Sequence, residues 1–136
     1  MTSMTDTLIA DSADRLMAEV VTPAAVRALK DLASAAPVWS ALAEPGFLDA
    51  LVAEAEGGAG LTADEALPVL LAAGRHALPL PLGATMTARA AIAAAGEAVP
   101  EGMIALAASA RRDGDELVAQ VPAGEFADAV LVPAEG

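Results

Sequence analysis

Apolar residues recur at helical spacing through the first two thirds of the chain, and at strand-like spacing only near its C-terminus. The first helix is predicted to run from Asp6, its N-cap, to about residue 20. One face of this helix carries four apolar residues: Ile9, Ala13, Leu16 and Val20. Thr22-Pro23 is typical of a helix start, because proline at the first position has no N–H to leave unpaired. It predicts a second helix over about residues 24–34, with these buried residues: Val26, Leu29 and Ala33.

Three further helices are predicted before residue 96. A short helix begins near Pro37 and ends at Pro45-Gly46, and an apolar segment of unassigned form, residues 47–53, follows it. A longer helix covers residues 62–77, and we expect Pro68 to bend it or to delay its regular start. Its apolar stripe is Leu67, Leu70, Leu71, Gly74 and Leu78. After an extended connector, an alanine-rich helix over residues 84–95 stops at Gly96.

The pattern after Gly96 is typical of short strands. They are predicted over residues 103–109, 117–121 and 129–132, with a turn at Asp113-Gly114. The sequence therefore predicts a mainly α protein. A five-helix domain over residues 1–96 is followed by a few short antiparallel strands over residues 97–136.

A glycine-rich corner precedes the fourth helix. Gly57, Gly58 and Gly60 lie within four positions, and Thr62 and Glu65 fit the capping-box pattern of the helix that follows. Such a corner is one way to bind a phosphate. However, no lysine follows at P-loop spacing, and two acids, Glu65 among them, already place negative charge at the helix start. We interpret the corner as a structural turn.

Charge and cysteine content narrow the function classes. The net charge is −12, from nineteen acidic and seven basic residues, which disfavours binding to nucleic acid or to an anionic membrane. The absence of cysteine excludes disulfides, thiolate metal sites and a cysteine nucleophile. No basic leader precedes the first apolar residues, and the uncharged runs are too short to cross a bilayer. The cytoplasm is the simplest expected location.

Few side chains suggest chemistry of their own. His76 is the single histidine, and at a helix end we expect it to have a structural role. Arg111-Arg112 could contact a phosphate of CoA or of a flavin, but a solvated hairpin tip is the favoured interpretation. Asp11-Ser12 is reminiscent of a carrier-protein attachment site, yet Ser12 falls within the first amphipathic helix. The adjacent acid pairs, Asp64/Glu65 and Asp115/Glu116, diverge and are expected to be solvated.

Three motifs occur in an order that resembles the N-terminal part of the acyl-CoA dehydrogenase family. Val38-Trp39-Ser40-Ala41-Leu42-Ala43-Glu44-Pro45-Gly46 is similar to the family's helix with Trp, Leu-Ala-Glu and a closing Gly. Glu54-Ala55-Glu56-Gly57-Gly58-Ala59-Gly60-Leu61 resembles its acidic Gly-Gly-x-Gly-Leu corner. The helix that ends in Gly74-Arg75, before Pro79-Leu80-Pro81-Leu82, resembles its next element. Together the motifs cover about residues 33–96.

The resemblance implies an all-α domain followed by a β domain and a C-terminal four-helix domain. In that family the last two domains hold FAD, and a C-terminal glutamate abstracts the α-proton of an acyl-CoA. The family's flavin-contacting Thr-Glu-Pro and Gly-Ser-Asp motifs are not found here, and residues 104–112 read Ile-Ala-Leu-Ala-Ala-Ser-Ala-Arg-Arg instead. We expect this chain to lack the C-terminal domain and its glutamate. No catalytic, cofactor-binding or metal-binding residue is therefore assigned.

The resemblance implies FAD-dependent oxidation of a CH–CH bond of an acyl-CoA. This chain would be a truncated copy, or a short subunit that forms a homo- or hetero-oligomer with a complete acyl-CoA dehydrogenase subunit. FAD is not expected to bind tightly to the chain alone. The alternative from the residues is a non-catalytic helical interaction or assembly module. A third hypothesis is an unrelated helical bundle with a similar glycine corner. The family interpretation, by contrast, requires the helices to be followed by strands that start a separate sheet, in place of a sixth helix.

Overall fold

The computed structural model describes residues 4–134, with five α-helices and four short strands in that range. The helices are α1 (Met4–Val20), α2 (Pro23–Ala28), α3 (Leu32–Ala43), α4 (Ala63–Arg75) and α5 (Leu82–Ala94). The strands are β1 (Ile104–Leu106), β2 (Ala110–Asp113), β3 (Glu116–Ala119) and β4 (Ala129–Leu131). Three 3-10 turns complete the set: η1 (Phe47–Asp49), η2 (Glu54–Glu56) and η3 (Gly124–Phe126). The mainly α fold class is confirmed, and strands rather than a sixth helix follow α5.

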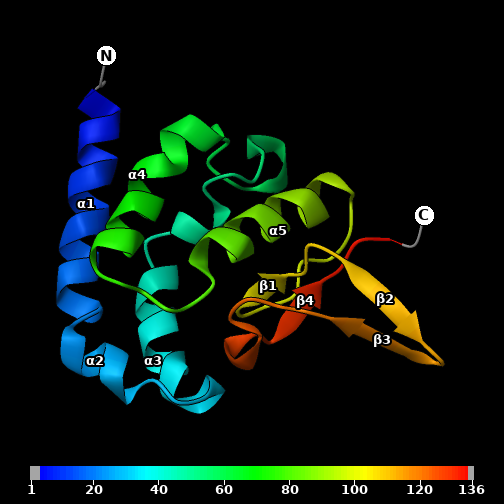
Figure 1. Cartoon of the computed structure of the whole chain (residues 1–136). Helices are drawn as coiled ribbons and strands as arrows, with labels where there is room; N and C mark the ends of the chain where they lie inside the picture. The colour runs from blue at the N-terminus through cyan, green and yellow to red at the C-terminus, as the bar shows by residue number, and fades with distance from the viewer. Residues whose placement is uncertain (1–3, 135–136) are drawn as a thin grey trace.

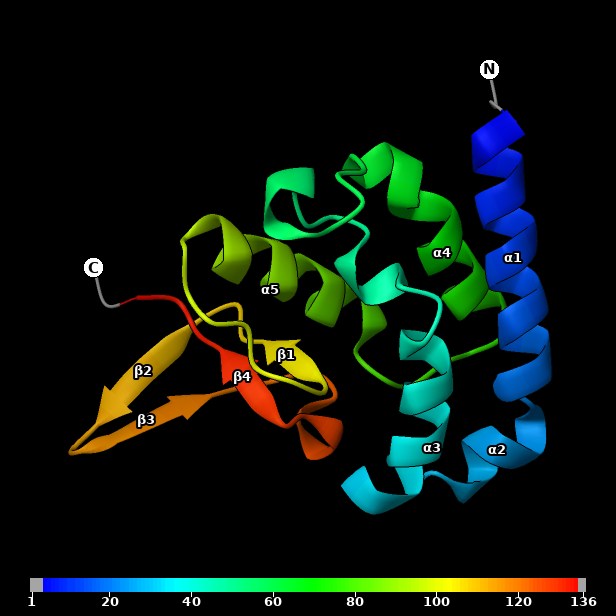
Figure 2. The ribbon, with the colours of Figure 1, turned by 180° about the vertical axis from the view of Figure 1, so that it is seen from behind.

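The core lies among the helices. α1 runs along α4, α3 and η1 pack beneath them, and α5 connects this helical layer to β1 (Figures 1 and 2). The buried residues of the core include Met17, Trp39, Leu42, Val69, Leu82, Met86, Met103 and Phe126. Alanines on the paired helices, Ala13 on α1 and Ala66 and Ala72 on α4, are almost completely buried. Such small residues allow the two helix backbones to approach closely.

The first helix extends further towards the N-terminus than its predicted cap. α1 begins at Met4, so Asp6 lies inside the helix, and the side chain of Asp6 is outside the described part of the chain. The predicted apolar face is on the core side: Ala13 is buried, and Ile9, Leu16 and Val20 are partly buried against the core. Residues 4 and 5 contain neither glycine nor proline, so nothing in them stops the helix at Asp6.

The second and third helices meet at a different place from the predicted one. The start at Thr22-Pro23 is confirmed, because the Thr22 hydroxyl accepts the N–H of Ala25. However, α2 ends at Ala28 and α3 begins at Leu32, five residues before Pro37. Asp31 and Ser34 form a reciprocal capping box whose hydrogen bonds hold the pKa of Asp31 below its ordinary value. This cap starts α3 at Leu32. The predicted burial of Ala33 is wrong, because that residue is exposed on α3.

The fourth helix begins where predicted and packs on a different face. Thr62 and Glu65 form the expected capping box, and the helix is continuous through Pro68, so its regular start is not delayed. The face turned to the core carries Ala66, Val69 and Ala72. Of the predicted stripe, Leu78 packs against the core, whereas Leu67, Leu70 and Leu71 are 45, 37 and 53 % exposed. α4 packs against α1 through this face because its small side chains allow a close approach, and the leucines are left outside the contact.

The fifth helix begins at Leu82, inside the predicted connector, and its end is confirmed. Gly96 follows the C-cap residue in a left-handed conformation, and its N–H bonds the carbonyl of Ala93. The buried hydroxyl of Thr85 joins this helix to the β region. It accepts the N–H of Ile104 at 3.0 Å and lies 2.7 Å from the carbonyl oxygen of Pro81.

The strands form two separate pairs. β2 and β3 form an antiparallel hairpin that extends away from the helices, with Asp113 paired to Glu116 so that the turn is at residues 114–115 (Figure 1). β1 and β4 are parallel, with Ile104 opposite Ala129, and the expectation of antiparallel pairing is wrong for this pair. The predicted strand over residues 103–109 ends at Leu106, because the chain leaves β1 there to enter the hairpin. A parallel pair needs such a connection between its strands.

Candidate functional site

The backbone N–H groups of the glycine corner are hydrogen-bonded to the segment that precedes it. The N–H groups of residues 56–61 all bond carbonyls of the segment 49–54, including Gly60 to Val52 at 2.8 Å and Leu61 to Ala50 at 2.9 Å. A side chain at Gly58 would collide with the backbone of Val52, so glycine is required for this close approach. An anion at this corner would find no free N–H of residues 56–61. The interpretation as a structural turn agrees with this geometry.

His76 lies at the C-cap of α4 and forms a cluster with two neighbours. Its Nε2 is 3.0 Å from Oδ1 of Asp14, and the same oxygen accepts hydrogen bonds from Nε and Nη2 of Arg75 at 3.3 and 3.1 Å. The hydrogen bond from His76, and then that from Arg75, hold the pKa of Asp14 below its ordinary value. These contacts join α1 to the end of α4, in agreement with the structural role expected for His76.

Arg111 and Arg112 belong to β2, on the exposed hairpin. Nη1 of Arg111 lies 3.6 Å from Oδ2 of Asp113, and both side chains are more than two thirds exposed. This placement agrees with a solvated hairpin rather than an enclosed phosphate site. Ser12 lies within α1, as expected from the sequence, and both Asp11 and Ser12 are exposed. The acid pairs are also exposed, at the start of α4 and on the hairpin.

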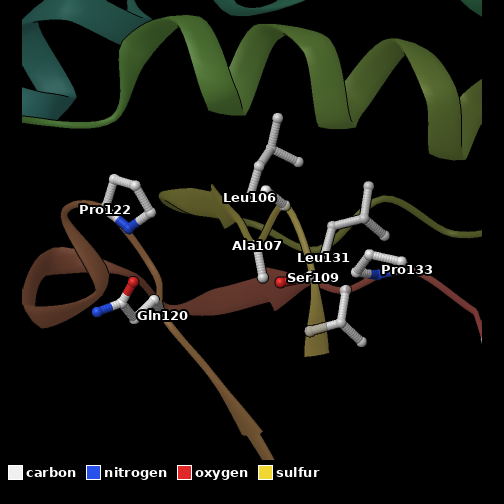
Figure 3. A pocket seen from close by; sticks show the side chains of 9 residues that line it. Leu106, Ala107, Ser109, Gln120, Pro122, Leu131 and Pro133 are labelled. Carbon is white, nitrogen blue, oxygen red and sulfur yellow. The ribbon is translucent and has the colours of Figure 1, made fainter. Parts of the chain in front are cut away.

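A groove of about 650 Å³ lies between the β1–β4 pair and the base of the hairpin. Figure 3 shows its labelled walls, with Leu106 and Ala107 at the end of β1, Gln120 and Pro122 after β3, and Leu131 at the end of β4. Ala108, Val132 and Pro133 complete the apolar lining. The polar side chains are those of Ser109 and Gln120.

This groove can bind an apolar group and offer it two hydrogen-bonding side chains. Its lining contains no carboxylate, histidine or cation, so these residues supply neither a general acid or base nor a counter-ion. A second hollow beside it shares Ser109 and Gln120 and adds Arg111. The groove includes residues 106–109, which replace the flavin-contacting motif expected at this point of the chain.

Sequence reasoning missed most of the groove. Its residues come from three segments that meet only because β4 returns to pair with β1, and they carry no motif. Alternating small and apolar residues in 104–109 were the available signal, and they indicated a strand rather than a site. Over residues 4–134, the side chains that commonly ligate metals do not gather in groups of three or more. In the same range, no helix has the length and apolar character needed to span a bilayer.

Comparison with known proteins gives one family. The model of the family described as "Acyl-CoA dehydrogenase, N-terminal domain" matches residues 3–99, well over half of the chain. Searches of curated proteins and of solved structures each found no match. The matched range covers the five helices and ends before β1, so all the residues that line the groove lie beyond it.

Proposed function

Because this chain belongs to the acyl-CoA dehydrogenase family through the family's N-terminal domain, we propose that it forms the helical domain of an FAD-dependent oxidoreductase. The reaction is the oxidation of a CH–CH bond of an acyl-CoA. The single observation that carries the proposal is the family match over residues 3–99, on a chain with the expected order of helices and strands. The remaining active-site groups come from a further domain or from a partner acyl-CoA dehydrogenase subunit.

The described residues fit only part of FAD. The apolar wall of the groove, with Ser109 and Gln120, suits one side of a flat ring. The pyrophosphate needs donors or cations, and Arg111, which lines the hollow beside the groove, is exposed and lies near Asp113. Residues 4–134 alone therefore do not fit the whole cofactor. This mismatch supports a shared site.

The outward leucine face of α4 supports assembly with further helices. Leu67 and Leu71 are about half exposed, and Leu70 lies beside the start of α5, where its side chain approaches Gly83. Covering an exposed apolar face by a neighbouring helix removes it from water, at about 25 cal/mol for each Å² of apolar surface. In the proposal, this face packs against the partner subunit or domain.

Capture of the tagged chain from the cells that produce it tests the proposal. We expect co-purified protein that contains flavin and reduces a dye when an acyl-CoA is added. Leu67→Gln together with Leu71→Gln should reduce the captured flavin, because these substitutions place amides on the proposed contact face. Leu8→Gln is the matched control, since Leu8 is 61 % exposed on a different helix, and it should leave the captured flavin unchanged.

The alternative function is a non-catalytic helical interaction or assembly module. The observation that favours it is the lack of any ionisable side chain in the groove lining. Capture of a stable partner that contains no flavin, through the same leucine face, would support this alternative. A chain that is monomeric and captures no flavoprotein would contradict the proposed oxidoreductase role.

A further inference from the structure

A smaller hollow of about 400 Å³ lies where the end of α1, the start of α2 and the end of α4 meet. Figure 2 shows the last turn of α4 beside the lower half of α1, with α2 following α1 directly. The lining consists of Val21, Pro23, Val26, Arg27, Arg75, His76 and Ala77. Its volume is within the range of about 300–1,000 Å³ that is typical of small-molecule pockets.

The pocket gathers basic side chains in a strongly acidic protein. The chain has seven Lys and Arg residues and one His against nineteen acids, yet two arginines and the histidine line this one hollow. None of the lining residues is acidic. The local sign of charge is therefore opposite to that of the molecule as a whole.

The guanidinium groups of Arg27 and Arg75 have N–H donors that are not used by the described residues. Arg27 is exposed on α2 and makes no hydrogen bond or ion pair with the described residues. Arg75 gives two N–H donors to Oδ1 of Asp14, and a guanidinium has five, which leaves three. Asp14 lies outside the lining and fixes the position of Arg75, while Nε2 of His76 is occupied by the same carboxylate.

The backbone at this end of α4 does not oppose an anion strongly. The carbonyls of Ala72, Ala73 and Gly74 accept the N–H groups of His76, Leu78 and Ala77, respectively. Ala77 adopts a left-handed conformation, with φ of 54°, to complete this cap. Three of the last four carbonyl oxygens of α4 are thereby paired, which reduces the negative charge they present at the helix end.

The rest of the pocket is apolar. Val21, Pro23, Val26 and Ala77 surround the cations, so an ion without an apolar part would leave this surface in contact with water. The planar fork of arginine matches carboxylate and phosphate oxygens in a bidentate way. The combination suits a ligand with an oxyanion head and a short apolar tail.

We propose that the pocket formed by Arg27, Arg75 and the surrounding apolar residues binds a small amphipathic oxyanion, either a carboxylate or a phosphate monoester. Arg27 and Arg75 hold the anionic head, and Val21, Val26 and Ala77 contact the apolar tail. This site is independent of flavin and of the groove beside β1, and it lies on residues that the helical domain provides alone.

NMR titration of the full-length labelled chain tests this site without any enzymatic assay. The probes are hexanoate, hexyl phosphate, inorganic phosphate and hexylammonium, followed through the methyl signals of Val21, Val26 and Ala77. We expect saturable shifts with hexanoate or hexyl phosphate, and none with hexylammonium. The tighter of the two binding probes identifies the head group as a carboxylate or a phosphate.

Arg27→Gln should weaken binding about tenfold, because it removes one charge-assisted contact and breaks no contact within the chain. Arg15→Gln makes the same charge change at an exposed position of α1 outside the pocket lining and should leave the dissociation constant within about twofold, as an exposed surface charge is screened. Equal binding by both variants, equal shifts with hexylammonium, or no saturable shift with any probe would overturn the proposal. Inorganic phosphate that binds as tightly as hexyl phosphate would overturn the role of the apolar wall.

Discussion

Thr85 is the buried polar residue of the described chain, and its hydroxyl links helix to strand. It accepts the backbone N–H of Ile104 and donates its single proton to a carbonyl, with that of Pro81 closest at 2.7 Å. The hydroxyl therefore holds β1 against the first turn of α5.

Replacing Thr85→Val should lower the free energy of unfolding by about 1–3 kcal/mol, because the buried N–H of Ile104 loses its acceptor while the side-chain volume is conserved. Urea denaturation measures the change. Thr87→Val is the matched control on the same helix, since the Thr87 hydroxyl also bonds an i−4 carbonyl but is exposed. The control should change the stability by less than about 0.5 kcal/mol. Equal effects of the two substitutions would show that the hydroxyl of Thr85 does not hold β1.

The Asp14 cluster predicts a pH-dependent contribution to stability. Hydrogen bonds from His76 and Arg75 keep the pKa of Asp14 below its ordinary value of 3.8. A carboxylate whose pKa is lowered in the folded state stabilises the fold at pH values above its pKa in the unfolded chain. This stabilisation is lost as the pH falls through its pKa in the folded chain. Asp14→Asn should therefore lower Tm at pH 7, and the difference from the unmodified chain should shrink below about pH 4.

Thermal unfolding followed at pH 7, 5 and 3 checks this prediction. Asp11→Asn removes the same charge from an exposed position of the same helix and serves as the control. A difference in Tm between the Asp14→Asn variant and the unmodified chain that stays constant from pH 7 to pH 3 would contradict the account.

At the scale of elements, local signals could be predicted and packing could not. Thr22-Pro23, the Thr62/Glu65 box and Gly96 mark helix ends through hydrogen bonds to nearby backbone, so the sequence alone identifies them. The leucine stripe of α4 is equally clear as a pattern. However, periodicity states which residues share a face and does not state which face another helix will cover.

The parallel pairing of β1 with β4 was also not predictable from local sequence signals. It depends on a return of the chain after the hairpin and η3, over more than 20 residues, and no local residue pattern encodes it. The groove depends on that return. For this reason the sequence predicted five helices but did not indicate Gln120, Pro122 or Leu131 as lining residues.

The assignment of faces on α4 is testable by substitution. Val69→Ala should destabilise the fold by about 2 kcal/mol, because the side chain is 1 % exposed and its removal leaves a cavity in the core. Leu67→Gln and Leu71→Gln should each change the stability of the isolated chain by less than about 0.5 kcal/mol, as surface substitutions do. Urea denaturation of the three variants gives the comparison. A larger loss for the leucine variants would show that the stripe, and not Val69, faces the core.

For the whole molecule, the family match and the groove lie in different parts of the chain. Residues 3–99 belong to the acyl-CoA dehydrogenase N-terminal domain, whereas the groove is formed entirely by residues 106–133. Family membership therefore explains the helical fold and assigns no role to the groove residues. We propose that residues 4–134 supply a scaffold and do not form a complete flavin site by themselves.

The visible absorbance spectrum of the purified chain tests that claim most directly. The chain is incubated with FAD and passed through gel filtration, and its spectrum is recorded before and after an acyl-CoA is added. The account predicts that no flavin band accompanies the protein and that acyl-CoA causes no change. A stoichiometric flavin band that bleaches when the acyl-CoA is added would contradict it.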